Sequence, residues 1–179
     1  ASGADVDVTN SGAIEAEGST WAGGIEAQGS ESVTVDNRGD ISATAAPFLQ
    51  VTYDGDAIGS GAVAGQAFGI YATGGEAGAG VTNSGNITVE GYYATGIEVQ
   101  SGGDIVLGNS GNIVAGSGLH EYYNPGNYYT YFYGTAVATG INAVSNGEGA
   151  HVEVSNSGDI SADGIFGGTG IAATSGGLY

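Results

Sequence analysis

The chain has 179 residues, of which 37 are Gly and only 2 are Pro, and its apolar residues amount to 41%. This composition excludes collagen, which needs Gly at every third position with abundant Pro, and it excludes disorder, which needs low hydrophobicity. Nineteen acidic residues against one base, Arg38, give a net charge of −18, so nucleic acid and anionic lipid are excluded as expected partners.

A five-residue pattern, Asn-(Ser/Arg)-Gly-x-Ile, recurs along the chain. Apolar residues stand two and four positions before each Asn and two positions after each Ile, which predicts a strand, a turn and a second strand with one buried face. We expect the Asn side chains to form a structural turn ladder, because Asn can hydrogen-bond to its equivalents up and down a stack. The ladder residues are Asn10, Asn37, Asn83, Asn109 and Asn156.

A second signature, Gly-Ile, follows each copy and predicts a third strand. The signatures are Gly24-Ile25, Gly69-Ile70, Gly96-Ile97, Gly140-Ile141 and Gly170-Ile171. Three short strands in about 26 residues are typical of one coil of a β-helix. The expected fold is therefore all-β, a parallel β-solenoid forming a single domain over 1–179, with coils at about 1–27, 28–73, 74–99, 100–143 and 144–179.

The ladder positions advance by 27, 46, 26 and 47 residues, so the unit is a doublet of 73 residues (27 + 46 and 26 + 47). Every second coil carries an insert, at about 46–64 and 117–135. Both inserts read as β-hairpins on the same side of the molecule. Asp54-Gly55 is a strong hairpin signal in the first, and Asn124-Pro125-Gly126-Asn127 forms the predicted turn of the second, with Tyr123 opposite Tyr128.

The second insert is the candidate contact surface, because Tyr is a rigid amphipathic residue that is enriched at recognition sites. Alternation places Tyr129, Tyr131 and Tyr133 on one face and Tyr128, Thr130 and Phe132 on the other. Cross-strand stabilisation of the hairpin is the alternative role for these rings. The full candidate surface is Tyr122, Tyr123, Tyr128, Tyr129, Tyr131, Phe132 and Tyr133.

No catalytic, cofactor-binding or metal-binding residue is expected, although the acidity would allow Ca²⁺ to bind. A polysaccharide-cleaving β-helix or phage tailspike would need paired carboxylates. The candidates are Asp54 with Asp56, flanking a turn, and Glu26 with Glu98, at equivalent outward positions two coils apart. His120 and His151 lie in separate segments, and each is expected to be a surface residue.

The Val-flanked units Asn-Ser-Gly-Asn-Ile and Asn-Ser-Gly-Asp-Ile, followed by Ala-Thr-Gly-Ile as at 94–97, resemble the passenger repeats of large bacterial autotransporter adhesins. The resemblance implies a right-handed solenoid exposed on the surface of a Gram-negative bacterium, with an outer-membrane barrel outside this chain. It carries over no binding residues.

The expected function is an extracellular adhesin stalk whose hairpins contact surface glycans or surface proteins. The alternative is a filament subunit that stacks end to end on copies of itself or on neighbouring repeats.

Overall fold

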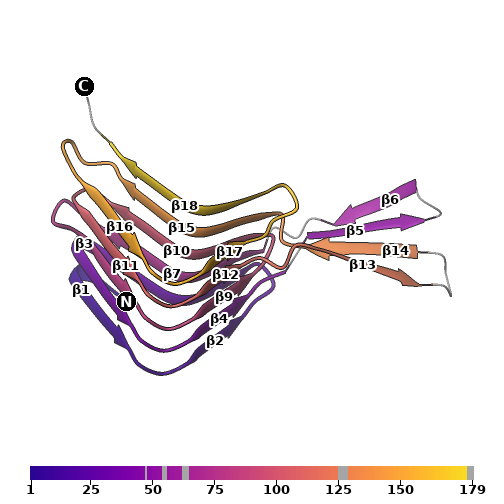
Figure 1. Cartoon of the computed structure of the whole chain (residues 1–179), viewed down its shortest axis with the longest axis horizontal. Helices are drawn as coiled ribbons and strands as arrows, with labels where there is room; N and C mark the ends of the chain where they lie inside the picture. The colour runs from indigo at the N-terminus through magenta and orange to yellow at the C-terminus, as the bar shows by residue number, and fades with distance from the viewer. Residues whose placement is uncertain (47, 54–55, 62–64, 125–128, 177–179) are drawn as a thin grey trace.

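The computed structural model describes residues 1–46, 48–53, 56–61, 65–124 and 129–176. Within these ranges the regular elements are all β-strands, grouped into three sheets that we call A, B and C. The all-β class predicted from the sequence is therefore confirmed. Figure 1 shows sheets A and B stacked in a common body, with sheet C to one side of it.

Sheet A is parallel and contains nine strands in the order β16-β11-β8-β3-β7-β10-β15-β18, with β1 also paired to β3. Equivalent residues of the repeats pair with one another, as in the row that joins Ile25, Ile70 and Ile97. The strands are β1 (Ser2–Asn10), β3 (Trp21–Asn37), β7 (Gln66–Gly74), β8 (Gly78–Asn83), β10 (Tyr93–Ser101), β11 (Ile105–Asn109), β15 (Val137–Ser145), β16 (Val152–Asn156) and β18 (Gly167–Ser175).

Sheet B is also parallel and runs in the order β17-β12-β9-β4-β2. Each of its short strands begins at the Ile of the recurring pattern, because that residue starts the buried alternation after the turn. The strands are β2 (Ile14–Glu17), β4 (Ile41–Thr44), β9 (Ile87–Glu90), β12 (Ile113–Ala115) and β17 (Ile160–Ala162).

The predicted five-coil, right-handed β-solenoid is wrong, and the reason lies in β3. This strand runs for 17 residues, pairing with β7 through its first half and with β1 and β8 through its second half. Two strand columns that the sequence predicted to be separate therefore belong to one continuous sheet. Sheet A is a barrel-like parallel wall, and B and C are separate sheets. Gly29 and Ser30, which lie between the Gly24-Ile25 signature and the apolar residues before Asn37, do not interrupt β3.

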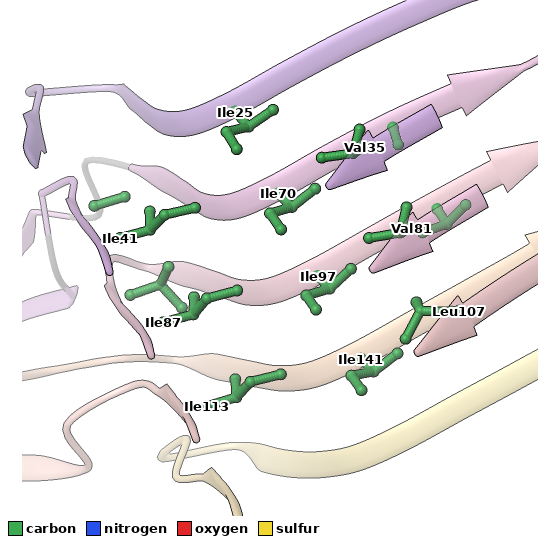
Figure 2. Packing of buried hydrophobic residues seen from close by; sticks show 14 of the residues in the cluster. Ile25, Val35, Ile41, Ile70, Val81, Ile87, Ile97, Leu107, Ile113 and Ile141 are labelled. Carbon is green, nitrogen blue, oxygen red and sulfur yellow. The ribbon is translucent and has the colours of Figure 1, made fainter. Parts of the chain in front are cut away.

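The core consists of β-branched and small side chains aligned in columns between sheets A and B. Ile70, Ile97 and Ile141 from sheet A face Ile87 and Ile113 from sheet B, and all five are fully buried (Figure 2). Complete burial of an Ile side chain contributes about 1.5–3 kcal/mol, so the repeated columns supply the main favourable term for folding. The Gly-Ile signature predicted the three positions in sheet A, and the recurring turn pattern predicted the two in sheet B.

The five ladder Asn residues form one continuous series of side-chain hydrogen bonds. Nδ2 of each Asn donates to Oδ1 of the next, at 2.8 Å for Asn10 to Asn37 and at 2.7 Å for the three later steps. Each Nδ2 also donates to the carbonyl oxygen of the Gly two residues later. Asn37 and Asn83 are buried, so these bonds satisfy polar groups that are removed from water.

A second ladder occupies the variable position of the same pattern. The backbone N–H of Asn86 donates to Oδ1 of Asp40, the N–H of Asn112 donates to Oδ1 of Asn86, and the N–H of Asp159 donates to Oδ1 of Asn112. Asp and Asn recur at this position because either side chain offers the required acceptor. The recurring pattern in the sequence leaves this position variable, so it did not predict this ladder.

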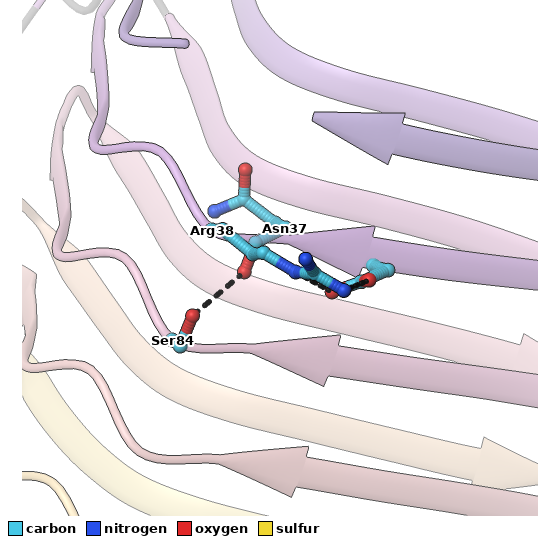
Figure 3. A network of polar contacts seen from close by, with 4 residues as sticks. Asn37, Arg38 and Ser84 are labelled. Carbon is cyan, nitrogen blue, oxygen red and sulfur yellow. Dashed lines mark hydrogen bonds and ion pairs between the residues drawn. The ribbon is translucent and has the colours of Figure 1, made fainter. Parts of the chain in front are cut away.

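The turn also carries the chain's single base, Arg38. Its Nη2 lies 2.6 Å from Oδ2 of Asp36, and the Oγ of Ser84 donates a 3.5 Å hydrogen bond to the carbonyl oxygen of Asn37 (Figure 3). The hydrogen bonds that the Arg38 guanidinium donates to Asp36, and then the negative charge of Asp36, raise the pKa of Arg38. The side chain is solvent-exposed, so this ion pair is a minor contribution to stability.

Close backbone approach explains the Gly of the same pattern. A Cβ placed on Gly85 would lie 2.1 Å from the carbonyl oxygen of Gly39, and one on Gly111 would lie 2.0 Å from that of Gly85. No side chain fits in these gaps. The Gly of the Gly-Ile signature is constrained in a similar way, because a Cβ on Gly96 would lie 2.4 Å from Cγ2 of Ile113.

Candidate functional site

Both predicted hairpin inserts are present as antiparallel strands in sheet C. The first insert contributes β5 (Phe48–Tyr53) and β6 (Asp56–Gly61), and the second contributes β13 (Leu119–Asn124) and β14 (Tyr129–Gly134). The predicted turn residues Asp54, Gly55, Pro125, Gly126 and Asn127 lie outside the described residues, as does Tyr128. Asn124, expected in the second turn, instead ends β13.

The two hairpins, which the sequence predicted on the same side of the molecule, pair with each other there. Strand β14 pairs antiparallel with β5, which gives one four-stranded sheet in the order β13-β14-β5-β6. Tyr129 lies opposite Tyr53 and Tyr131 lies opposite Val51. Residues from the second and fourth repeats thus form a single element that projects sideways from the stacked sheets (Figure 1).

The register of the second hairpin differs from the prediction by two residues. Tyr123 lies opposite Thr130, and Asn124 lies opposite Tyr129, so the connection between the strands is 125–128 rather than 124–127. The proposed cross-strand pair of Tyr123 with Tyr128 is therefore wrong.

The aromatic residues of β13 and β14 are accessible on both faces of sheet C. Tyr133, at 40% exposure, belongs to one face, and Tyr123, at 50%, belongs to the other, because positions alternate along each strand. The ring of Tyr133 stacks on His120 with centroids 5.2 Å apart, and Tyr129 lies 6.4 Å from Tyr131. Tyr129, Tyr131 and Phe132 are half-buried. Tyr122 lies opposite Tyr131 in the ladder.

Of the two carboxylate pairs that were candidates for catalysis, the structure describes both members of only one. Asp54 lies outside the described residues, and Asp56 begins β6. Glu26 and Glu98 are at equivalent positions, as predicted, and Tyr71 stands between them as the register partner of both. Each glutamate accepts a hydrogen bond from a nearby amide, Gln28 at 2.6 Å and Gln100 at 2.7 Å.

The pKa of Tyr71 is affected by both of these glutamates. Burial of its phenol raises its pKa above the ordinary value, and the charges of Glu98 and Glu26 raise it further. All three effects disfavour the phenolate, because it would be poorly solvated and would lie close to two anions. At neutral pH Tyr71 is therefore a neutral hydroxyl between two carboxylates.

The two histidines lie in different parts of the fold, since His120 belongs to sheet C and His151 directly precedes β16 of sheet A. His120 is exposed on β13 and stacks on Tyr133, whereas the exposed His151 donates its backbone N–H to Oδ1 of Asp104 at 2.8 Å. Among the described residues, no group of three or more His, Cys, Asp or Glu side chains is arranged to hold a metal ion. In the same part of the chain, no helix has the length and apolarity needed to cross a membrane.

A second aromatic group, on the outer face of sheet A, was missed by the sequence analysis. It contains Trp21 on β3, Phe68 and Tyr71 on β7, and Tyr93 on β10, and we call it the aromatic platform. The centroids of Trp21 and Phe68 are 4.9 Å apart, and those of Phe68 and Tyr71 are 5.5 Å apart. Trp21 is 43% exposed and Tyr93 is 42% exposed.

Aligning the repeats on the Gly-Ile signature would have revealed this group. Trp21 and Tyr93 each stand four residues before a signature Ile (25 − 4 and 97 − 4), and pairing with Gln66 places them in one row. Glu26 and Glu98 each stand one residue after it. The residue types at these positions differ from repeat to repeat, so the recurring pattern does not include them.

The comparisons with protein-family models, with curated proteins and with solved structures found no match.

Proposed function

We propose that this chain is a non-catalytic structural and adhesive protein of the cell exterior, which contacts surface glycans through sheet C. The observation that carries the proposal is the pairing of β14 with β5, which joins two hairpins from distant repeats into one projecting sheet with exposed Tyr side chains. A four-stranded sheet is a more stable platform than either hairpin alone, because an isolated hairpin is marginal in water.

The side chains of sheet C suit contact with sugars. Tyr123 and Tyr133 expose ring surface together with a hydroxyl group, and such side chains provide contact area and hydrogen bonding at a small entropy cost. Thr130, Glu121 and His120 add polar groups to the same two strands. A surface of this kind favours neutral, hydroxyl-rich ligands, and the net charge of −18 disfavours anionic ones.

The rest of the chain supports a structural role. The recurring positions of its repeats form the core columns, the Asn ladder and the close-packed Gly residues. The same interactions in every repeat favour a rigid support that holds the contact sheet at a fixed place.

The test is binding of the purified chain to a panel of immobilised neutral oligosaccharides. The variants Tyr123→Ala and Tyr133→Ala, alone and combined, are compared with Phe166→Ala, which removes an aromatic ring that is 66% exposed outside sheet C. We expect the combined variant to weaken binding at least tenfold, which corresponds to about 1.4 kcal/mol, and the control to bind like the parent chain. Equal binding by all variants, or no binding to any member of the panel, contradicts the proposal.

A further inference from the structure

The aromatic platform joins exposed rings to two carboxylates on a single sheet face. Trp21, Phe68 and Tyr71 form a continuous series of ring contacts across β3 and β7. The indole of Trp21 lies over Gly23, since a Cβ at Gly23 would be 3.4 Å from its Nε1. Glu26 and Glu98 flank Tyr71 on the neighbouring strands.

Among the described residues, neither Glu26 nor Glu98 forms an ion pair, and the N-terminal ammonium of Ala1 donates a 2.7 Å hydrogen bond to the backbone carbonyl oxygen of Glu26 rather than to its carboxylate. The sequence contains a single Lys or Arg, and that residue, Arg38, lies 2.6 Å from Asp36. Glu26 and Glu98 instead accept neutral amide hydrogen bonds from Gln28 and Gln100 through their Oε1 atoms. These bonds orient the carboxylates without neutralising them, so the face keeps two negative charges beside its rings.

We propose that the aromatic platform, with Glu26 and Glu98, docks an extended Lys- or Arg-rich segment of a partner protein. Carboxylates attract such side chains by charge, and aromatic faces attract the same cations through their quadrupoles. The alkyl stems of Lys and Arg also cover apolar ring surface while the charged groups stay in water. This docking is independent of the glycan contact proposed for sheet C.

Charge complementarity favours a basic segment over a second copy of the chain or a sugar. A second copy of the chain brings one basic residue and 19 acids, so it cannot supply the cations. A neutral sugar carries no charge to pair with Glu26 and Glu98, whereas a Lys or Arg side chain pairs with either carboxylate. The net charge of −18 adds long-range attraction for a polycation.

The spacing of the carboxylates sets the spacing of the expected bases. Glu26 and Glu98 are two strands apart, which corresponds to about 9.6 Å in a parallel sheet. In a polyproline II segment every third residue returns to the same side after about 9.3 Å. A segment with a basic residue at every third position, running across the strands, therefore places one cation at each carboxylate.

Trp21 provides a direct reporter, because it is the only Trp in the chain. The experiment titrates the intact chain with a synthetic Lys-Pro-Pro repeat peptide and follows Trp21 fluorescence, with a Gln-Pro-Pro peptide of equal length as the uncharged probe. The double variant Glu26→Gln with Glu98→Gln is compared with Glu15→Gln with Glu17→Gln. The control pair removes the same charge from exposed positions on β2 of sheet B.

We expect the Lys peptide to change the emission of Trp21 and the Gln peptide to leave it unchanged. The Glu26/Glu98 variant should bind the Lys peptide about tenfold more weakly, and Phe68→Leu about threefold more weakly, while the Glu15/Glu17 control stays within about twofold of the parent. Thermal melts verify that each variant is folded. The proposal is overturned if the two double variants bind alike, if the Lys peptide leaves Trp21 emission unchanged, or if the Gln peptide binds equally well.

Discussion

Nδ2 of Asn37 donates a 2.7 Å hydrogen bond to Oδ1 of Asn83, a residue 46 positions further along the chain, and both side chains are buried. The contact spans the whole first insert, so it joins two turns that are distant in sequence and adjacent in space. Since Asn83 also donates to Asn109 and to the carbonyl oxygen of Gly85, it lies at the centre of the ladder.

Replacing Asn83 with Ala should therefore destabilise the protein by about 3 kcal/mol, because several buried polar groups lose a partner at once. Urea unfolding followed by circular dichroism measures the change. The matched variant is Asn156→Ala, at the exposed last position of the ladder, and it should cost less than about 1 kcal/mol. Equal losses at the two positions would show that burial does not govern the ladder's contribution.

The Gly residues of the turns offer a second comparison within one motif. Gly85→Ala places a methyl group 2.1 Å from the carbonyl oxygen of Gly39, whereas a Cβ on Gly12 meets nothing within 4 Å. We expect the first substitution to lower the free energy of unfolding by about 3 kcal/mol and the second to change it by less than about 0.5 kcal/mol. Chemical denaturation of both variants tests this, and a neutral Gly85→Ala would refute the close approach.

The pairing of the two hairpins is testable by crosslinking, since the chain contains no Cys. Cys residues introduced at Thr52 and Thr130, which lie directly opposite in the β5–β14 ladder, should form a disulfide under mild oxidation. The control pair, Thr52→Cys with Phe132→Cys, is offset by two residues and should crosslink far less. Peptide mass spectrometry after digestion quantifies both. Comparable yields would rule out this register.

The ionisation of Tyr71 tests the electrostatics of the platform. Because Glu98 is one of the charges that raise the pKa of Tyr71, Glu98→Gln should lower that pKa towards its ordinary value, while Glu15→Gln should leave it unchanged. Site-resolved NMR of labelled tyrosine rings gives both titrations. A raised folded-state pKa stabilises the fold below the ordinary value of 10 and ceases to do so as the pH rises through the folded-state pKa. An unchanged titration in Glu98→Gln would contradict the assigned cause.

The sequence predicted the features that depend on local, repeated chemistry. Alternating apolar residues located core positions such as Val81, the Gly-Ile signature located Ile97, and the turn pattern located the Asn series. The two longer spacings located both hairpin inserts. Each of these follows from short-range periodicity or turn chemistry, which a single sequence displays directly.

The features that the sequence did not predict depend on how distant segments meet. Whether β3 ends at Gly29 or continues decides between separate strand columns and one barrel-like sheet, and local propensity does not distinguish the two. The pairing of β14 with β5 likewise depends on the placement of two inserts in space. The sequence did not predict the aromatic platform, because Trp21, Phe68 and Tyr71 occupy different positions in their repeats and come together only across paired strands.

The pairing of β5 with β14 also constrains the order of assembly. Tyr53 and its partner Tyr129 are separated by 76 residues (129 − 53), and the third repeat lies between them in the chain. Bringing such distant strands together costs loop-closure entropy. Once the intervening repeat has stacked, the two strands are already close, so most of that entropy cost has been overcome. We therefore expect sheet C to form late in folding, and a chain whose middle repeats stack out of register should fail to form it.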